Sequence, residues 1–195
     1  MTNHPSKAYI FSLVLLLLLL LSSCASLKDN NVEMIYKVGD TGPAKGLVFF
    51  DKGDSLDGWR YLEVAPAKTE VSLQWGDVDS IVGDTSSALG QGKNNTSLIV
   101  TSQTDIGHKI YAAKYCEDLS LTGYDDWFLP SQDELDLLYW QLANQERGEF
   151  KTLGFGYWSS SEYDETQAWG QGFTSGVQGK IEKTDFFLVR AIRSF

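Results

Sequence analysis

Thiol and imidazole groups, which carry much nucleophilic and metal chemistry, are scarce in this chain. It contains two cysteines, Cys24 and Cys116, and only one histidine, His108, beyond the first few residues. A neighbouring histidine can activate a thiol by lowering its pKa. Cys116, however, shares the apolar face of a predicted helix with Ala112 and Leu119, so we interpret it as a small core residue. His108 is predicted to be exposed.

The first 23 residues have the pattern of a secretory leader. Lys7 is their only charged side chain, and an apolar stretch follows that ends in seven leucines, Leu15 to Leu21. This stretch is shorter than the roughly 20 apolar residues that a membrane-spanning helix needs. We therefore predict that residues 1–23 are a signal peptide.

The leader ends in Leu21-Ser22-Ser23-Cys24, which resembles a bacterial lipobox. In such a sequence Cys24 becomes the first residue of the mature protein and carries two acyl chains such as palmitate, enough for a stable membrane anchor. The alternative is an ordinary signal peptide followed by a chance cysteine. Because Ala25 rather than aspartate comes next, we expect an outer-membrane or cell-surface location in the bacterial envelope. Residues 24–35 are predicted to be a lipidated tether.

Composition restricts what the rest of the chain can do. The formal net charge is −10, and it becomes −11 once Lys7 is removed with the leader. Nucleic-acid binding requires basic clusters, so we predict no nucleic-acid partner. Once Cys24 is lipidated, one thiol and one imidazole remain, too few for a His/Cys zinc site or an internal disulfide. We predict no catalytic residue, no metal ligand and no cofactor, and a monomeric domain.

Short apolar runs separated by turn residues predict strands on both sides of a central helical region. The predicted strands are residues 47–50, 59–64, 98–100, 157–159, 168–173 and 186–192. Residues 83–97, rich in Gly, Ser, Asn and Thr, are predicted to be a long exposed loop. One helix is predicted over residues 110–119. A second follows Pro130, where Ser131 and Glu134 form a capping box. This order predicts an α+β domain.

Several ordered motifs resemble those of one family. They are Val38–Phe50, Gly58–Pro66, Ala113–Leu119, Gly123–Ser131 with Glu134-Leu135, Tyr157–Tyr163, Ala168-Trp169 and Val189–Arg193. Together they are similar to the domain at the C-terminal end of Legionella collagen-like proteins, formerly a domain of unknown function. The resemblance covers residues 36–195, which we assign as one domain.

The resemblance implies a C-type-lectin-like fold. In that fold a looped antiparallel sheet is combined with two helices, and the N- and C-terminal strands pair. It also implies a surface-exposed binding or adhesion module, sometimes for sulfated polysaccharides, without agreed catalytic residues.

The chain departs from related families at three points. Ala191 stands where many relatives have a cysteine that could pair with one in the first helix, the position of Cys116. The Glu-Pro-Asn, Gln-Pro-Asp and Trp-Asn-Asp triplets of calcium-dependent lectins do not occur. The reactive cysteines of formylglycine-generating enzymes, which are distant fold relatives, are also missing.

Aromatic residues are the main candidates for ligand binding. Trp75, Tyr124 and Tyr163 lie near predicted loops, where an exposed ring could stack on a sugar. The residues inside the family motifs are expected to be structural; these are Trp127, Pro130, Ser131, Glu134, Trp158, Trp169 and Arg190.

Charged residues suggest two weaker sites. Asp125-Asp126 and Glu162–Glu165 could offer oxygen ligands to calcium, although such clusters are expected by chance among 26 acidic residues. The nearest approach to a basic patch consists of Lys180, Lys183, Arg190 and Arg193, with acids interleaved.

The sequence thus predicts a lipid-anchored module that binds a glycan or a host or matrix protein. A structural or assembly role with another envelope protein is the alternative. A third possibility is an enzyme that acts on envelope carbohydrate through two carboxylates.

Overall fold

The computed structural model describes residues 34–76, 81–103, 109–152, 154 and 156–195. The folded unit is Tyr36–Phe195. The predicted leader, Cys24, most of the predicted tether and His108 lie outside the described residues. Within those residues, none of the helices has the length and apolar character needed to cross a bilayer.

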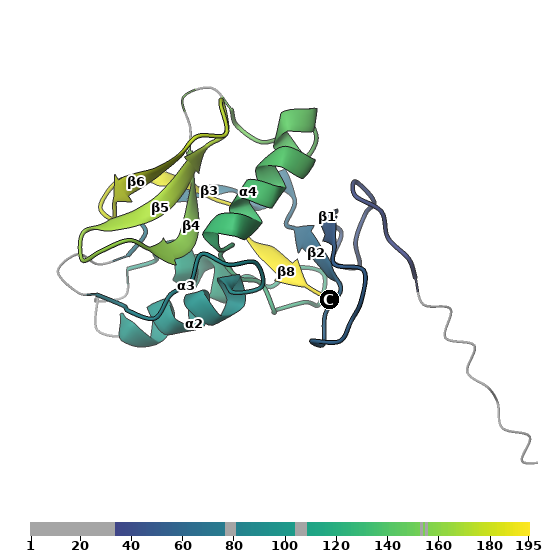
Figure 1. Ribbon diagram of the computed structural model, residues 1–195, viewed down its shortest axis with the longest axis horizontal. Helices are drawn as coiled ribbons and strands as arrows, with labels where there is room; N and C mark the ends of the chain where they lie inside the picture. The colour runs from purple at the N-terminus through teal and green to yellow at the C-terminus, as the bar shows by residue number, and fades with distance from the viewer. Residues whose placement is uncertain (1–33, 77–80, 104–108, 153, 155) are drawn as a thin grey trace, which may run out of the picture. The chain divides into compact units, whose positions relative to one another are not determined.

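Two sheets form the framework of the domain (Figure 1). The smaller one is antiparallel and has the order β1-β2-β8, with β1 at Leu47–Asp51, β2 at Tyr61–Val64 and β8 at Ile192–Ser194. The larger one has the order β3-β7-β4-β5-β6. Its strands are β3 (Val71–Leu73), β7 (Phe187–Val189), β4 (Gly156–Glu162), β5 (Gln167–Gly172) and β6 (Gln178–Glu182). The pairing of β4 with β7 is parallel, so this sheet is mixed.

In the described part of the chain three α-helices, rather than the predicted two, accompany the sheets. They are α2 (Gly92–Ser102), α3 (Ala112–Glu117) and α4 (Gln132–Gln141), and two short 3₁₀ helices lie at Ala67–Thr69 and Ala143–Gln145. The predicted loop over residues 83–97 and the predicted strand over residues 98–100 are therefore wrong from Gly92 onward.

Hydrogen bonds to residues outside the helix explain why α2 was not predicted from the sequence. Asn and Thr have low intrinsic helix propensity. In the fold, the Asn95 side chain accepts a bond from the Ser86 N–H at 2.9 Å and donates one to the Ser86 carbonyl at 2.7 Å. The Thr96 hydroxyl accepts a bond from the Leu129 N–H at 3.0 Å. Both side chains are buried, so tertiary contacts rather than propensity stabilise this helix.

The start of α4 confirms the predicted capping box. The Ser131 hydroxyl accepts a bond from the Glu134 N–H, and the Glu134 carboxylate accepts one from the Ser131 N–H at 2.7 Å. The same carboxylate also accepts a bond from the Gly90 N–H at 2.9 Å. Burial raises the pKa of Glu134 to about 7, although these N–H donors act in the opposite direction. The cap therefore also fixes the segment that leads into α2.

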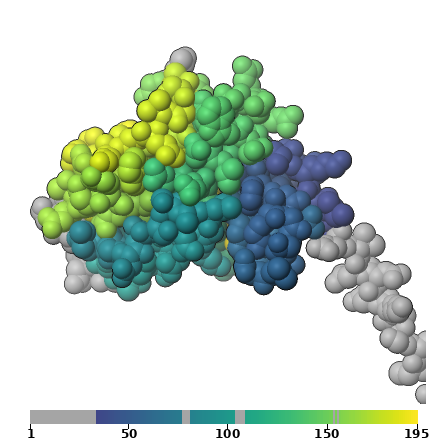
Figure 2. All heavy atoms as spheres, viewed as in Figure 1, coloured from purple at the N-terminus to yellow at the C-terminus, as the bar shows by residue number. Residues whose placement is uncertain are grey.

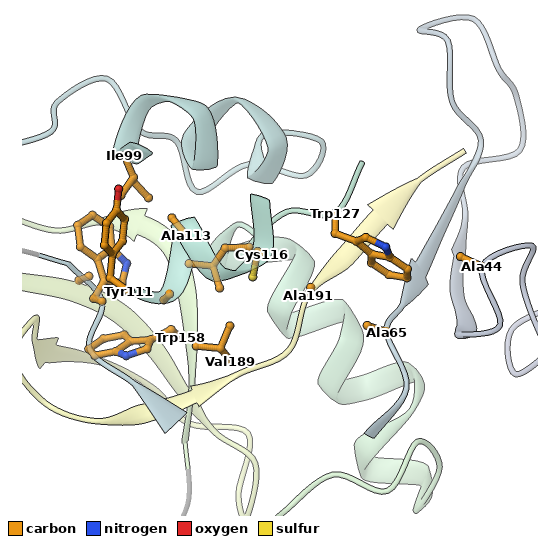
Figure 3. Packing of buried hydrophobic residues seen from close by; sticks show 14 residues of the cluster. Ala44, Ala65, Ile99, Tyr111, Ala113, Cys116, Trp127, Trp158, Val189 and Ala191 are labelled. Atoms are coloured by element: carbon orange, nitrogen blue, oxygen red, sulfur yellow. The ribbon is translucent and has the colours of Figure 1, made fainter. Parts of the chain in front are cut away.

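The described residues form two hydrophobic clusters. One gathers side chains of α2, α3, β4 and the C-terminal segment, and Figure 3 shows Cys116, Trp127, Trp158 and Val189 within it. The other packs α4 against β1, β2 and β4, with Leu135 and Tyr157 fully buried. Cys116 is fully buried and burial raises the pKa of its thiol, as expected for a core residue.

The α+β class is confirmed. The C-terminal strand β8 pairs with β2, which in turn pairs with β1, so the N- and C-terminal parts of the domain meet in one sheet. Four strands were predicted at about the right place, whereas β3 and β6 were not predicted. The predicted strand at residues 186–192 is interrupted at Arg190-Ala191, where the chain passes from one sheet to the other. The C-type-lectin-like assignment stays a prediction.

The capping box predicts a specific loss of stability. Replacement of Ser131 by alanine removes the acceptor for the Glu134 N–H and should lower the free energy of unfolding by about 1 kcal/mol in urea denaturation. The control is Ser72→Ala on the exposed side of β3, which should change stability by no more than about 0.5 kcal/mol. Equal effects of the two substitutions would contradict this view of the cap.

Candidate functional site

The β5–β6 hairpin has a polar and aromatic face that is partly open to solvent and partly covered by α4. Its register pairs Trp169 with Lys180, Gln171 with Gln178, and Gln167 with Glu182. Because side chains alternate along a strand and paired residues share a face, all six lie on one side of the sheet. The hairpin lies at the outside of the domain next to β4 (Figures 1 and 2).

Tyr163 is the most exposed ring on this face. Its side chain is 46% exposed and contacts Trp169 edge to face, with ring centroids 5.7 Å apart. The Lys180 ammonium lies 3.5 Å from the Tyr163 ring centroid and 5.8 Å from that of Trp169. Such cation–π contacts hold an ammonium beside a ring while leaving its N–H donors available. We call these three residues the Tyr163 platform.

A strip of amide side chains continues the platform towards α4. Gln171 donates to Asp136 Oδ1 at 2.7 Å and to the Gly176 carbonyl at 3.0 Å. Gln132 donates to Gln178 Oε1 at 2.8 Å, and Gln178 donates to the Gln132 carbonyl at 3.2 Å. These bonds fix the amide groups, so the face combines exposed aromatic surface with oriented polar groups.

One amide oxygen on this face is left without a partner. Gln171 is 1% exposed, and its Oε1 accepts no hydrogen bond from any residue that the structure describes. Buried polar atoms are nearly always satisfied, so an unpaired one calls for a physical reason.

Of the three aromatic side chains predicted to bind a ligand, only that of Tyr163 is exposed to solvent. Trp75 is fully buried: its indole N–H donates to the Ser159 carbonyl at 2.8 Å, and the Lys183 ammonium lies 4.9 Å from its ring centroid. The prediction that Trp75 is exposed is therefore wrong. Tyr124 is half-buried, and the Arg193 guanidinium covers its ring at 4.2 Å from the centroid.

Most residues of the family motifs are buried in structural positions. Trp127 and Trp158 lie in the core, and the Trp158 N–H donates to the Leu73 carbonyl at 3.0 Å. The Pro130 carbonyl accepts bonds from the N–H and the hydroxyl of Ser160, and Ser131 and Glu134 form the cap described above. Trp169 differs from the expectation of a core position, because it is only half-buried and contributes to the Tyr163 platform.

Arg190 is buried in a network that joins three segments. Its guanidinium donates to the Ala65 carbonyl at 2.7 Å, to Glu70 at 2.9 Å and to the Gly148 carbonyl at 2.6 Å. The Tyr157 hydroxyl donates to the same Glu70 carboxylate at 2.6 Å. Arg190 therefore has a structural role and is not available to a ligand.

The acidic motifs are occupied by interactions within the domain. Glu162 accepts bonds from the Lys183 ammonium at 2.6 Å and from the N–H groups of Val82 and Gly83. Asp126 forms a two-bond pair with Arg193; burial raises its pKa, but the bonds from Arg193 outweigh burial and lower it. Among the described residues no three His, Cys, Asp or Glu side chains are grouped as metal ligands would be. Calcium binding stays a prediction without identified ligands.

The suggested basic patch does not form. Lys183, Arg190 and Arg193 are buried and paired with acids, which leaves Lys180 as the exposed member of the four. The sequence predicts Lys180 only as a member of this patch, and it does not predict the three glutamines of the platform face, Gln167, Gln171 and Gln178. The signal that could have found them is the alternation of polar residues along 167–171 and 178–182.

Comparison with known proteins places the chain in a family. The model of the Lcl C-terminal domain family matches residues 68–193, more than half of the chain. The chain belongs to this family.

A solved structure also resembles the domain. It is that of a fimbrial protein from Bacteroides ovatus ATCC 8483, with a TM-score of 0.58 and 14% sequence identity. The match covers 82% of this chain and 49% of that one, so the chain spans about half the length of the fimbrial protein. At this identity the likeness concerns the fold alone. A search among curated proteins gave no match.

Two neighbouring lysines should differ sharply in their effect on stability. Lys183→Met leaves the buried Glu162 carboxylate without its cation and should cost about 3–5 kcal/mol of unfolding free energy. Lys180→Met, on the exposed platform, should cost less than about 1 kcal/mol. Thermal and urea unfolding of both variants would measure the two losses of unfolding free energy. Equal losses would contradict a stabilising role for the buried ion pair.

Proposed function

We propose that this chain is a non-catalytic binding module, displayed at the bacterial cell surface, that mediates adhesion to glycans or to host or matrix proteins. The observation that carries the proposal is the Tyr163 platform, in which the rings of Tyr163 and Trp169 lie together and the Lys180 ammonium contacts both. Membership of the Lcl C-terminal domain family supports it. The fold shared with a fimbrial protein agrees with a surface role.

The platform has the chemistry that a sugar ring requires. The exposed ring of Tyr163 and the half-exposed ring of Trp169 offer flat apolar surface against which the C–H face of a sugar can pack. The Lys180 ammonium can donate to hydroxyl or carboxylate oxygens, and Gln167 and Gln178 lie on the same face. A few oriented polar groups beside apolar surface are the usual composition of ligand sites.

Binding of another envelope protein is the second candidate. It is favoured by a separate apolar groove on the opposite face of the same sheet, lined by Val177, Ile181 and Phe187. Catalysis on envelope carbohydrate has less support, because the carboxylates of the motifs at Asp126, Glu162 and Asp164 are engaged in internal hydrogen bonds.

Glycan binding through the platform predicts a loss of affinity on removal of its rings. In a glycan array with the full-length chain, run with calcium and with chelator, Tyr163→Ala and Trp169→Ala should each weaken binding at least tenfold, about 1.4 kcal/mol. Lys180→Met should have a similar effect.

The control is Trp140→Ala, which removes an equally exposed ring from α4, outside the platform. It should leave glycan binding unchanged. If no glycan binds the wild-type chain, or if Trp140→Ala weakens binding as much as Tyr163→Ala, the platform is not the glycan site.

We also propose that the module is anchored by lipid on Cys24, as the lipobox-like sequence predicts. Cys24→Ala should release the chain from the membrane fraction and remove the mass of the acyl chains, as measured by fractionation and mass spectrometry of the mature protein. A variant that stays membrane-bound with unchanged mass would show that the anchor is not at Cys24.

A further inference from the structure

The face of the β4-β5-β6 sheet opposite the Tyr163 platform carries a groove with a floor of glycine. Gly156 pairs with Gly172 across β4 and β5, and Gly170 pairs with Gly179 across β5 and β6. All four line a groove of about 400 Å³, whose walls include Val177, Ile181 and Phe187. Four glycines together within a sheet are unusual, because glycine weakens strands and often marks a close approach of another molecule.

Two of these glycines are required by the domain itself. A Cβ atom on Gly156 would lie 2.2 Å from Phe187 Cε1, which is a steric clash. A Cβ on Gly170 would lie 3.1 Å from the Tyr157 carbonyl oxygen and 3.4 Å from the Phe187 ring. The Phe187 ring therefore rests on these two positions and forms one wall of the groove.

The other two glycines have no such internal reason. A Cβ on Gly172 or on Gly179 would have its nearest neighbour at 3.8 Å, an ordinary van der Waals contact. Neither residue has a positive φ, so the backbone would accept a side chain at both positions. Any side chain there would project into the groove and fill it. The absence of a side chain keeps the groove open at a cost in strand propensity.

The lining of the groove indicates what occupies it. Among the residues that the structure describes, no charged side chain lines it, although the chain is 22% charged and has a net charge of −10. The described walls are mainly apolar, and Thr174 and Ser175 add hydroxyl groups. Val177 on the wall is 67% exposed, as is Phe186, the residue before Phe187. A sugar, which carries a hydroxyl on most carbons, would leave many of its polar groups unpaired here.

We propose that this groove, the glycine groove, is a docking site for an uncharged apolar segment of another protein, which inserts an aromatic or branched side chain against the glycine backbone. The bare peptide planes at Gly172 and Gly179 give a flat floor that an inserted ring or methyl group can contact directly. This site is independent of glycan binding at the Tyr163 platform, which lies on the other face of the same strands. The module then has two binding faces of different chemistry.

The test uses the full-length chain labelled with ¹⁵N-glycine, in a mild detergent. The probe is a capped pentapeptide with a central phenylalanine between threonines, titrated to millimolar concentration. We expect the amide signals of Gly170, Gly172 and Gly179 to shift, with no shift from matched peptides that have lysine or glutamate at the centre. Gly172→Val and Gly179→Val should each weaken the affinity for the phenylalanine peptide at least tenfold. The melting temperature of each variant should equal or exceed that of the wild type.

Trp140→Ala, on α4 and outside the groove, is the control for the site and should leave peptide binding unchanged. The proposal is overturned if no apolar peptide shifts the groove glycines, or if Gly172→Val binds the peptide as the wild type does. It is also overturned if glucose shifts the same signals, or if the signals move with protein concentration alone, since the occupant would then be a sugar or a second copy. Loss of glycan binding in Tyr163→Ala has no bearing on this result.

Discussion

The segment from Phe187 to Ser194 belongs to both sheets, and the other elements are arranged around it. Its first part, β7, lies between β3 and β4, and its last part, β8, completes the smaller sheet against β2. Two buried arginines fix the passage between them. Arg190 binds Glu70 and two backbone carbonyls, and Arg193 binds Asp126 and Glu63. Removal of one partner from such buried pairs is strongly destabilising, so this passage holds the two sheets in one arrangement.

The outer strands β5 and β6 follow from this arrangement. Within the sheet they are hydrogen-bonded to the central segment only by way of β4, so β6 is an edge strand and the hairpin lies at the outer edge of the sheet. One face gathers Tyr163, Trp169 and Lys180, and the other has the glycine floor. The two faces of the hairpin therefore differ in chemistry, one aromatic and polar and the other mainly apolar.

Local signals in the sequence were sufficient for the elements that local interactions stabilise. The capping box at Ser131 and Glu134 and the apolar run at residues 47–50 needed no knowledge of the fold. Two of the misses, helix α2 and the burial of Trp75, follow from contacts with residues outside the local segment. Helix α2 depends on Asn95 and Thr96 bonding to Ser86 and Leu129, and Trp75 is buried by Ser159 and Lys183, far along the chain. For the candidate site, Tyr163 was predicted, but its pairing with Lys180 required the register of β5 and β6.

The shared C-terminal segment has a consequence for how the chain folds as it is made. Neither sheet can be completed until residues 187–194 are available, because β3 and β4 meet only through β7, and β2 lacks its second neighbour until β8 arrives. During synthesis, which delivers the chain from its N-terminus, β1 and β2 must wait as an unfinished hairpin. Closing contacts so distant in sequence is slow, so both sheets are completed only after the last strand has been synthesised.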